Sequence, residues 1–185
     1  MKIAYFVHGK KHLPKIGAKQ NPGNLFGNMK STTKKITEFL NDYSRTLDDA
    51  QKSKLEKLQY DAWSFGGKKE ISEKLINLVL SGKKTATAGL FFESEKIPAA
   101  GSLGIILDQD ENPCCLIEYT EVSTKLFTDV DFEFAKDEGE GFMSLEDWQK
   151  EHRKVFKEWH NNIFSDESFV LCERFRLLFP KNCST

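Results

Sequence analysis

An alternating apolar pattern near the end of the chain limits the fold most strongly. Apolar side chains recur at every second position, with one polar interruption at Glu173, through Phe169, Leu171, Phe175, Leu177 and Phe179. A period of two places these side chains on one face of a β-strand. A long strand with one apolar face needs neighbouring strands and a covering layer, so we expect this chain to build a sheet.

Shorter strand patterns precede that segment. Residues 103–107 form a compact apolar run, and residues 114–123 follow after the turn-forming residues 110–112. Residues 85–92 combine β-branched threonines with an apolar end, and the turn at 98–101 separates them from the next run. This spacing predicts hairpin-connected strands.

Helical patterns flank the strands. One helix is expected from Lys69 to Ser81 because Ile71, Leu75, Leu78 and Val79 share a face, and Gly82 stands at the position of a C-terminal cap. Ser144 with Asp147 predicts the start of a longer helix whose apolar face includes Trp148 and His152. Further helices are expected at 31–42, at 46–58 (opened by Thr46 with Asp49) and at 129–137. The whole pattern predicts an α+β domain with a small curved sheet or barrel.

The first part of the chain differs in charge from the rest. Residues 1–40 hold eight lysines and one acidic residue, a net charge of +7, whereas the whole chain carries −1. Glycine and proline punctuate residues 1–30, so we expect an irregular arm in which 2–7 adds at most one strand. We therefore predict a basic extension at 1–34 and a domain at 35–182. The arm is either a solvated extension or a phosphate-contacting segment that helps to bind nucleic acid.

Composition narrows the class of protein. No apolar run reaches the ~20 residues that a membrane helix needs, and the first apolar stretch is too short for a signal peptide. We therefore expect a cytoplasmic protein with no membrane partner. No Cys-x-x-Cys pair occurs among the four cysteines, so neither a metal site nor a cofactor is predicted. The sequence contains no indication of oligomeric state.

Lys84 and Thr87 form the first candidate site. A lysine whose charged form is disfavoured can accept a proton from a hydroxyl, and threonine needs such a base to become a nucleophile. Both residues reach one site only if Lys84 lies in the turn before the strand that carries Thr87. Lys83 and Thr85 are neighbouring candidates for ligand contact. The alternative is a solvated helix end, in which the lysines interact with the helix dipole.

Glu138 and Glu140 are candidates in a glycine-flanked turn. Glycines allow the tight backbone conformations that place a carboxylate at a site. A glutamate beside a lysine–threonine pair would orient an amine, move a proton or pair with the lysine. The alternative is a solvent-exposed acidic loop before a helix.

Aromatic and buried polar residues supply the remaining candidates. Trp63, Ser64 and Phe65 would line a pocket in which an aromatic ring stacks on a base, or they pack in the core. Glu173 interrupts the apolar face of the last strand, so it must be partnered or face a ligand site. His152 lies on the apolar face of its helix, where a hydrogen-bonded core histidine is the favoured interpretation.

Together these segments resemble the bacterial ASCH (activating signal cointegrator homology) domain family. The likeness runs in the expected order over residues 35–180 through four stretches: Ala62–Gly66, Ser81–Thr87, Glu138–Gly141 with Ser144, Leu145, Trp148 and His152 following, and Cys172–Phe175. The resemblance implies a PUA-like fold, a small β-barrel with flanking helices, and a site for a nucleoside or RNA-derived ligand.

The resemblance also implies an activity. One branch of the family hydrolyses N(4)-acetylcytidine with a lysine, a threonine and a glutamate, and motif register assigns these roles to Lys84, Thr87 and Glu138. Thr87 would attack the acetyl carbonyl, Lys84 would activate it, and Glu138 would manage the proton on the leaving amine. That branch has an arginine two residues after its threonine, where this chain has Gly89. A non-catalytic RNA-binding module and a ribonuclease are the alternatives.

Overall fold

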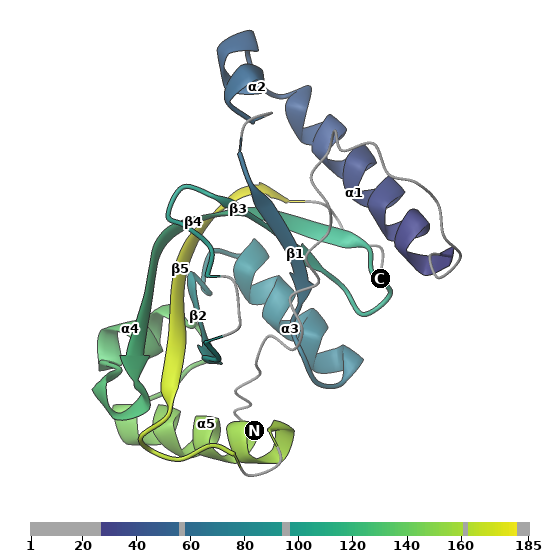
Figure 1. Ribbon diagram of the computed structural model, residues 1–185. Helices are drawn as coiled ribbons and strands as arrows, with labels where there is room; N and C mark the ends of the chain where they lie inside the picture. The colour runs from purple at the N-terminus through teal and green to yellow at the C-terminus, as the bar shows by residue number, and fades with distance from the viewer. Residues whose placement is uncertain (1–26, 56–57, 94–96, 161–162, 181–185) are drawn as a thin grey trace.

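The fold is a curled five-stranded sheet with helices on both faces (Figure 1). The structure is a computed structural model that describes residues 27–55, 58–93, 97–160 and 163–180. Its strands follow one another across the sheet in the order β1 (Tyr60–Ser64), β3 (Leu103–Leu107), β4 (Pro113–Leu126), β5 (Phe169–Pro180) and β2 (Ala86–Leu90). Strands β1 and β3 pair in parallel, and the remaining pairs are antiparallel. The predicted α+β class with a small barrel-like sheet is confirmed.

The two long strands produce the curl. Strands β4 and β5 pair along almost their full length, and their register shifts at Leu116/Ile117 and again at Tyr119/Glu121. Each shift is a bulge, which bends the strand and increases its local twist. As a result the sheet rolls into a half-barrel, and β1 and β2 form its two edges.

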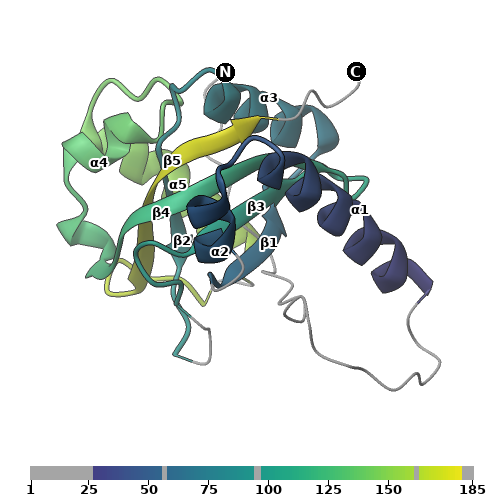
Figure 2. The same cartoon turned by 90° about the horizontal axis from the view of Figure 1, so that it is seen from above.

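Three groups of buried residues attach the helices to the sheet. Helix α3 (Lys69–Leu80) packs through Leu75, Ile76 and Val79 against β1, β3 and β4 on one face. Helix α1 (Gly27–Ser44) covers the other face at the β1–β3 end through Ile36 and Phe39. Helices α4 (Phe132–Asp137) and α5 (Leu145–Trp159) cover the alanines of β2 on that same face. Figure 2 shows α4 and α1 at opposite ends of the sheet.

Local signals predicted the central helices well. Helix α3 begins at Lys69 as expected, and Gly82, with a φ of 71°, follows it in the left-handed conformation of a C-terminal cap. The Ser144 side chain accepts the backbone N–H of Asp147 at 3.1 Å and starts α5. Strand β3 has the predicted bounds, and α4 begins at Phe132 rather than at Asp129 because Asp131 is its cap.

The early helices differ from the prediction. Helix α1 begins at Gly27, before the expected position 31, so the expected domain boundary at 34/35 falls inside it. Helix α2 is Asp49–Leu55 and ends before the expected Leu58. Its capping box is Asp48 with Gln51, whose side chains each accept the other's backbone N–H at 2.8 and 3.0 Å, and not Thr46 with Asp49. Strand β1 was missed, and the possible strand at 2–7 lies outside the described residues.

No helix in the described ranges is long and apolar enough to cross a membrane. The described side chains also contain no group of three His, Cys, Asp or Glu residues arranged to hold a metal ion.

Candidate functional site

Direct backbone contact joins the Lys84 segment to the acidic turn. The N–H of Thr85 donates to the carbonyl of Asp137 at 2.8 Å, and its hydroxyl donates to the same oxygen at 3.3 Å. Gly139 has a φ of 70°, and a Cβ there would lie 2.1 Å from the carbonyl oxygen of Lys83. Only glycine fits this contact, so the glycine in the turn brings the neighbouring glutamates up to Lys84.

Lys84 is buried and paired. Its Nζ lies 2.7 Å from Glu140 Oε1 and 3.3 Å from the backbone oxygen of Glu138. The side chains of Lys84 and Glu140 are 0% and 3% exposed. The ammonium also lies 5.7 Å from the centre of the Phe65 ring, within the range of a cation–π contact. Lys84 therefore belongs to an interior site, and the interpretation of a solvated helix end is wrong for this residue.

The Glu138 carboxylate is fully engaged by protein groups. Odd-numbered residues at both ends of β2, Thr85 and Phe91, form backbone hydrogen bonds to β5. Since backbone groups alternate in direction along a strand, the N–H of Ala88 points away from β5, to the outer edge of β2. There it donates to Glu138 Oε1 at 2.7 Å. Trp148 Nε1 donates to Glu138 Oε2 at 3.1 Å. His152 Nε2 lies 3.4 Å from the same oxygen. Glu138 thus anchors the edge of β2 to helix α5.

His152 contacts both Trp148 and Glu138. Its Nδ1 lies 3.0 Å from the carbonyl oxygen of Trp148. Its Nε2 faces the Glu138 carboxylate at 3.4 Å. The His152 ring also stacks on Trp148 with ring centres 3.9 Å apart. His152 and Trp148 therefore hold the same oxygen of Glu138 from one face of α5.

The two glutamates have opposite pKa shifts. Burial alone would raise the pKa of Glu138, but the charges of Lys84 and His152 and the bonds from His152 and Trp148 outweigh it and lower the pKa below its usual value. For Glu140, burial and the negative charge of Glu138 outweigh the attraction of Lys84 and raise the pKa. Of the two carboxylates, Glu140 is therefore the better proton acceptor.

The hydroxyl of Thr87 has no hydrogen-bond partner among the described residues. Thr87 lies opposite Glu173 in the register of β2 and β5, on the face away from the packed side chains of Ala86 and Ala88. Its side chain is buried, and among the described residues neither Thr87 Oγ1 nor Glu140 Oε2 meets a hydrogen-bonding group. An unsatisfied buried polar atom costs about 1–3 kcal/mol. Glu140 belongs to the buried ion pair with Lys84, and Thr87 follows Lys84 by three residues, so a ligand that reaches both atoms would supply the missing bonds.

Aromatic residues continue the site toward β1. Trp63 Nε1 donates to the Tyr119 hydroxyl at 2.9 Å, and that hydroxyl donates to Asp61 Oδ1 at 3.1 Å. The Phe65 ring meets the Trp63 ring edge-on, with centres 5.1 Å apart. Burial, with the charges of Glu173 and Asp61, raises the pKa of Tyr119 well above its usual value of 10.0. Tyr119 therefore acts as a neutral hydroxyl that holds Trp63 in place.

The structure brings together most of the predicted residues. Lys84 directly contacts both Glu138 and Glu140. Thr87 immediately precedes Ala88, whose N–H donates to Glu138, and Glu173 is the cross-strand partner of Thr87. Trp63 and Phe65 are buried near Lys84, whereas Ser64 is half-buried at the end of β1. Lys83 is exposed, and only its backbone takes part in the site.

The predicted hydrogen-bonded core histidine at position 152 is confirmed, because His152 is buried and its Nδ1 lies 3.0 Å from the Trp148 carbonyl. The structure adds two participants that the sequence candidates do not include, Trp148 and Tyr119. Trp148 and His152 are four residues apart, so they share a face of α5, and polar ring atoms on an otherwise apolar face were a signal of a buried acceptor. Tyr119 offered no such signal, because its partners lie 56 and 58 residues away along the chain.

A curled sheet of this order with helices on both faces is the PUA-like α+β fold. The sequence model of the ASCH domain matches residues 61–178, a range that contains every residue of the site described above. The chain belongs to the ASCH domain family.

Solved structures agree with that assignment. The chain is 28% identical to an ASCH domain from Lactobacillus crispatus, with a TM-score of 0.69, over 82% of this chain and 97% of that one. It is 29% identical to a protein from Enterococcus faecalis, with a TM-score of 0.63, over 85% of this chain and 98% of that one. The search of curated proteins found no match.

Proposed function

We propose that this ASCH domain binds a nucleoside or RNA-derived ligand at the Lys84 site and hydrolyses an amide on its base, such as the acetyl group of N(4)-acetylcytidine. The observation that carries the proposal is the buried Thr87 hydroxyl, which has no hydrogen-bond partner among the described residues. A buried threonine three residues after a buried lysine, which itself pairs with a proton-accepting carboxylate, supplies the parts of an activated nucleophile.

The geometry favours Glu140 for the proton transfers. Both oxygens of Glu138 already accept bonds from protein groups, whereas Glu140 Oε2 accepts none among the described residues. Glu140 therefore takes the proton-transfer role that the family resemblance gives to Glu138. It also takes the role of base that the resemblance gives to Lys84, because the Lys84 ammonium is paired with Glu140. Glu138 positions the strand that carries Thr87.

The reaction then has two stages. Thr87 Oγ1 bonds to the acetyl carbon as its proton passes to Glu140, and Lys84 donates to the developing oxyanion. The C–N bond breaks as Glu140 returns that proton to the exocyclic nitrogen. In the second stage Glu140 takes a proton from water, whose oxygen bonds to the acetyl carbon, and Glu140 returns that proton to Thr87 Oγ1 as the ester bond breaks. The acetic acid then releases its proton to solvent, so N(4)-acetylcytidine and water give cytidine, acetate and one proton.

The charge of the site favours a base over a phosphate. The Lys84 ammonium is matched by Glu140 at 2.7 Å, and Glu138 adds a second carboxylate beside His152. These four groups therefore supply no unmatched positive charge for a phosphate. This balance supports amide hydrolysis over the ribonuclease alternative.

The test follows cytidine release from N(4)-acetylcytidine. Thr87→Val removes the hydroxyl and keeps the shape, and we expect turnover to fall by about 10³-fold or more. Glu140→Gln is expected to cost about 10²- to 10⁴-fold, as for loss of a general acid–base. Thr85→Val is the matched control, because the Thr85 hydroxyl bonds to a backbone oxygen outside the reacting group.

Two results would count against hydrolysis. Wild-type turnover by folded Thr87→Val would exclude Thr87 as the nucleophile. Binding of the nucleoside without any release of cytidine would favour the non-catalytic alternative.

A further inference from the structure

A hollow lies at the end of β2 and β5, and its lining comes from both faces of the sheet. Leu90 and Phe92 belong to the face that packs against α5. Phe91 and Phe169 belong to the face that carries Thr87, because strands keep alternate residues on one face. Phe91 donates its N–H to the carbonyl of Phe169 at 2.9 Å, so the two residues are direct cross-strand neighbours.

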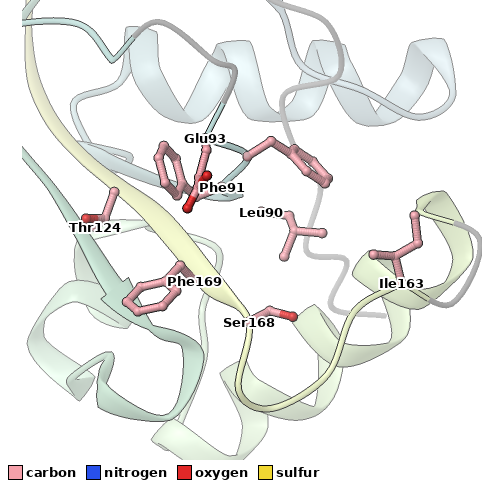
Figure 3. A pocket seen from close by; sticks show the side chains of 8 residues that line it. Leu90, Phe91, Glu93, Thr124, Ile163, Ser168 and Phe169 are labelled. Carbon is pink, nitrogen blue, oxygen red and sulfur yellow. The ribbon is translucent and has the colours of Figure 1, made fainter.

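The hollow has the size of a ligand site. A cavity of about 410 Å³ lies at this end of β2 and β5, and Figure 3 shows the side chains that surround it. This volume falls within the range of ~300–1,000 Å³ that is usual for small-molecule sites. Its apolar wall consists of Leu90, Phe91, Phe92, Ile163 and Phe169. Phe169 is 52% exposed and Ile163 70% exposed, so the hollow leaves aromatic and aliphatic surface in water.

The polar groups of the hollow suit the edge of a base. Glu93, Thr124 and Ser168 complete the lining, and among the described lining residues Glu93 is the only charged one. A carboxylate repels phosphate and accepts bonds from the amino and imino groups of a base. Phenylalanine faces are the platforms on which proteins stack unpaired bases.

The hollow lies beyond the reach of the base at Thr87. Four residues at about 3.4 Å each separate Thr87 from Phe91, a distance of about 14 Å along β2. Stacked neighbouring bases lie only about 3.4 Å apart, so a base in the hollow belongs to another, splayed nucleotide. Gly89 lies between the two positions, so β2 places no side chain between them on this face.

We propose that the hollow between Phe91 and Phe169 is a base-stacking subsite, and that the ligand of this domain is a single-stranded oligoribonucleotide and not a free nucleoside. This inference rests on the proposed function, because it takes the base at Thr87 as the reacting one. The subsite would provide a second contact with the ligand, in which a flanking base stacks on phenylalanine and its amino groups donate hydrogen bonds.

The first experiment measures binding and does not depend on turnover. Calorimetric titration with an unmodified pentaribonucleotide is compared for the wild type, Phe169→Ala and Phe91→Ala. We expect each alanine to weaken binding roughly 5- to 150-fold, the effect of losing one stacked base. Phe169 is half exposed, so its truncation leaves the core intact. Met143→Ala, at another exposed apolar residue, is the control and should bind as the wild type does.

The second experiment compares turnover of N(4)-acetylcytidine with that of a pentaribonucleotide containing it. We expect Phe169→Ala to lower kcat/KM for the oligonucleotide and to leave that for the nucleoside unchanged. If Phe91→Ala and Phe169→Ala bind the oligonucleotide as tightly as the wild type does, the subsite is excluded, even if hydrolysis depends on Thr87. Binding that depends on Phe169 without any hydrolysis would support the subsite and reject the proposed reaction. A wild type that dimerises, with Phe169→Ala monomeric, would assign the patch to a second copy and overturn the subsite.

Discussion

Glu138 Oε1 accepts the backbone N–H of Ala88 at 2.7 Å, so one side chain of the acidic turn replaces a neighbouring strand at the outer edge of β2. The other oxygen is held by Trp148 and His152 of α5. The position of Thr87, one residue before Ala88, therefore depends on a chain of contacts that runs from the helix through the carboxylate to the strand.

The first prediction concerns the Lys84–Glu140 pair. Lys84→Met should destabilise the fold by about 3–5 kcal/mol, because it leaves a buried carboxylate without its cation. Adding Glu140→Gln should recover part of that loss, since the lone charge is then removed. Urea unfolding of the two single variants and the double variant gives the coupling energy. Additive effects of the two substitutions would show that the pair does not interact.

The second prediction concerns pH. The pKa of Glu138 is lowered from 4.5, so its contribution to stability is present above pH 4.5 and is lost as the pH falls through its folded-state pKa. The pKa of Glu140 is raised from 4.5, so its contribution is present below pH 4.5 and is lost as the pH rises through its folded-state pKa.

Glutamine substitutions should therefore change the pH profile in opposite ways. In Glu138→Gln the free energy of unfolding should fall less steeply below pH 4.5 than in the wild type. In Glu140→Gln it should fall less steeply above pH 4.5. The slope should change by up to about 1.4 kcal/mol per pH unit in each case. The measurement is the free energy of unfolding from pH 3 to pH 8. Parallel profiles for the two variants would contradict the assigned pKa directions.

The third prediction concerns the turn glycines. Gly139→Ala should cost more than about 2 kcal/mol, because the left-handed conformation is strained and the new Cβ would lie 2.1 Å from the Lys83 carbonyl oxygen. Gly141→Ala is the matched control: its φ is 86°, but a Cβ there meets no atom within 4 Å. It should cost only the conformational penalty of about 1–2 kcal/mol. If thermal unfolding shows equal losses of stability for the two variants, the Lys83 backbone moves away from the new Cβ without a measurable cost.

The fourth prediction concerns Tyr119. Tyr119→Phe should destabilise the protein by about 1–3 kcal/mol, since Trp63 Nε1 loses its acceptor and Asp61 loses a donor. Tyr60→Phe, at a half-buried tyrosine of the same sheet, should change stability little. Chemical denaturation measures both. In an ultraviolet titration, Tyr119 should stay protonated well above pH 10.0 while the protein is folded.

The sequence predicted the features that local rules determine. Helix α3 ends where Gly82 allows it, α5 begins where Ser144 caps it, and Lys84 lies in the turn that lets it share a site with the following strand. Family resemblance added the order of the motifs, and the ASCH match confirmed it.

The remaining features depend on strand order. Nothing in the local pattern shows that β2 is an edge strand. The sequence therefore does not reveal that the Ala88 N–H needs an acceptor outside the sheet, which Glu138 provides. Strand β1 was missed because it has only five residues, contains Asp61 and is followed by two glycines. The bond between Trp63 and Tyr119 needs the sheet to curl, and it could not be read from either segment alone.

The balanced charges of the site have a kinetic consequence. The Lys84 ammonium is matched by Glu140 at 2.7 Å and both side chains are buried, so this pair projects little electric field beyond the protein surface. A neutral base then enters by diffusion and is selected only after contact, by its shape and its donors. The association rate at this site should therefore hardly change with ionic strength, and discrimination between ligands should appear in how long each one stays bound.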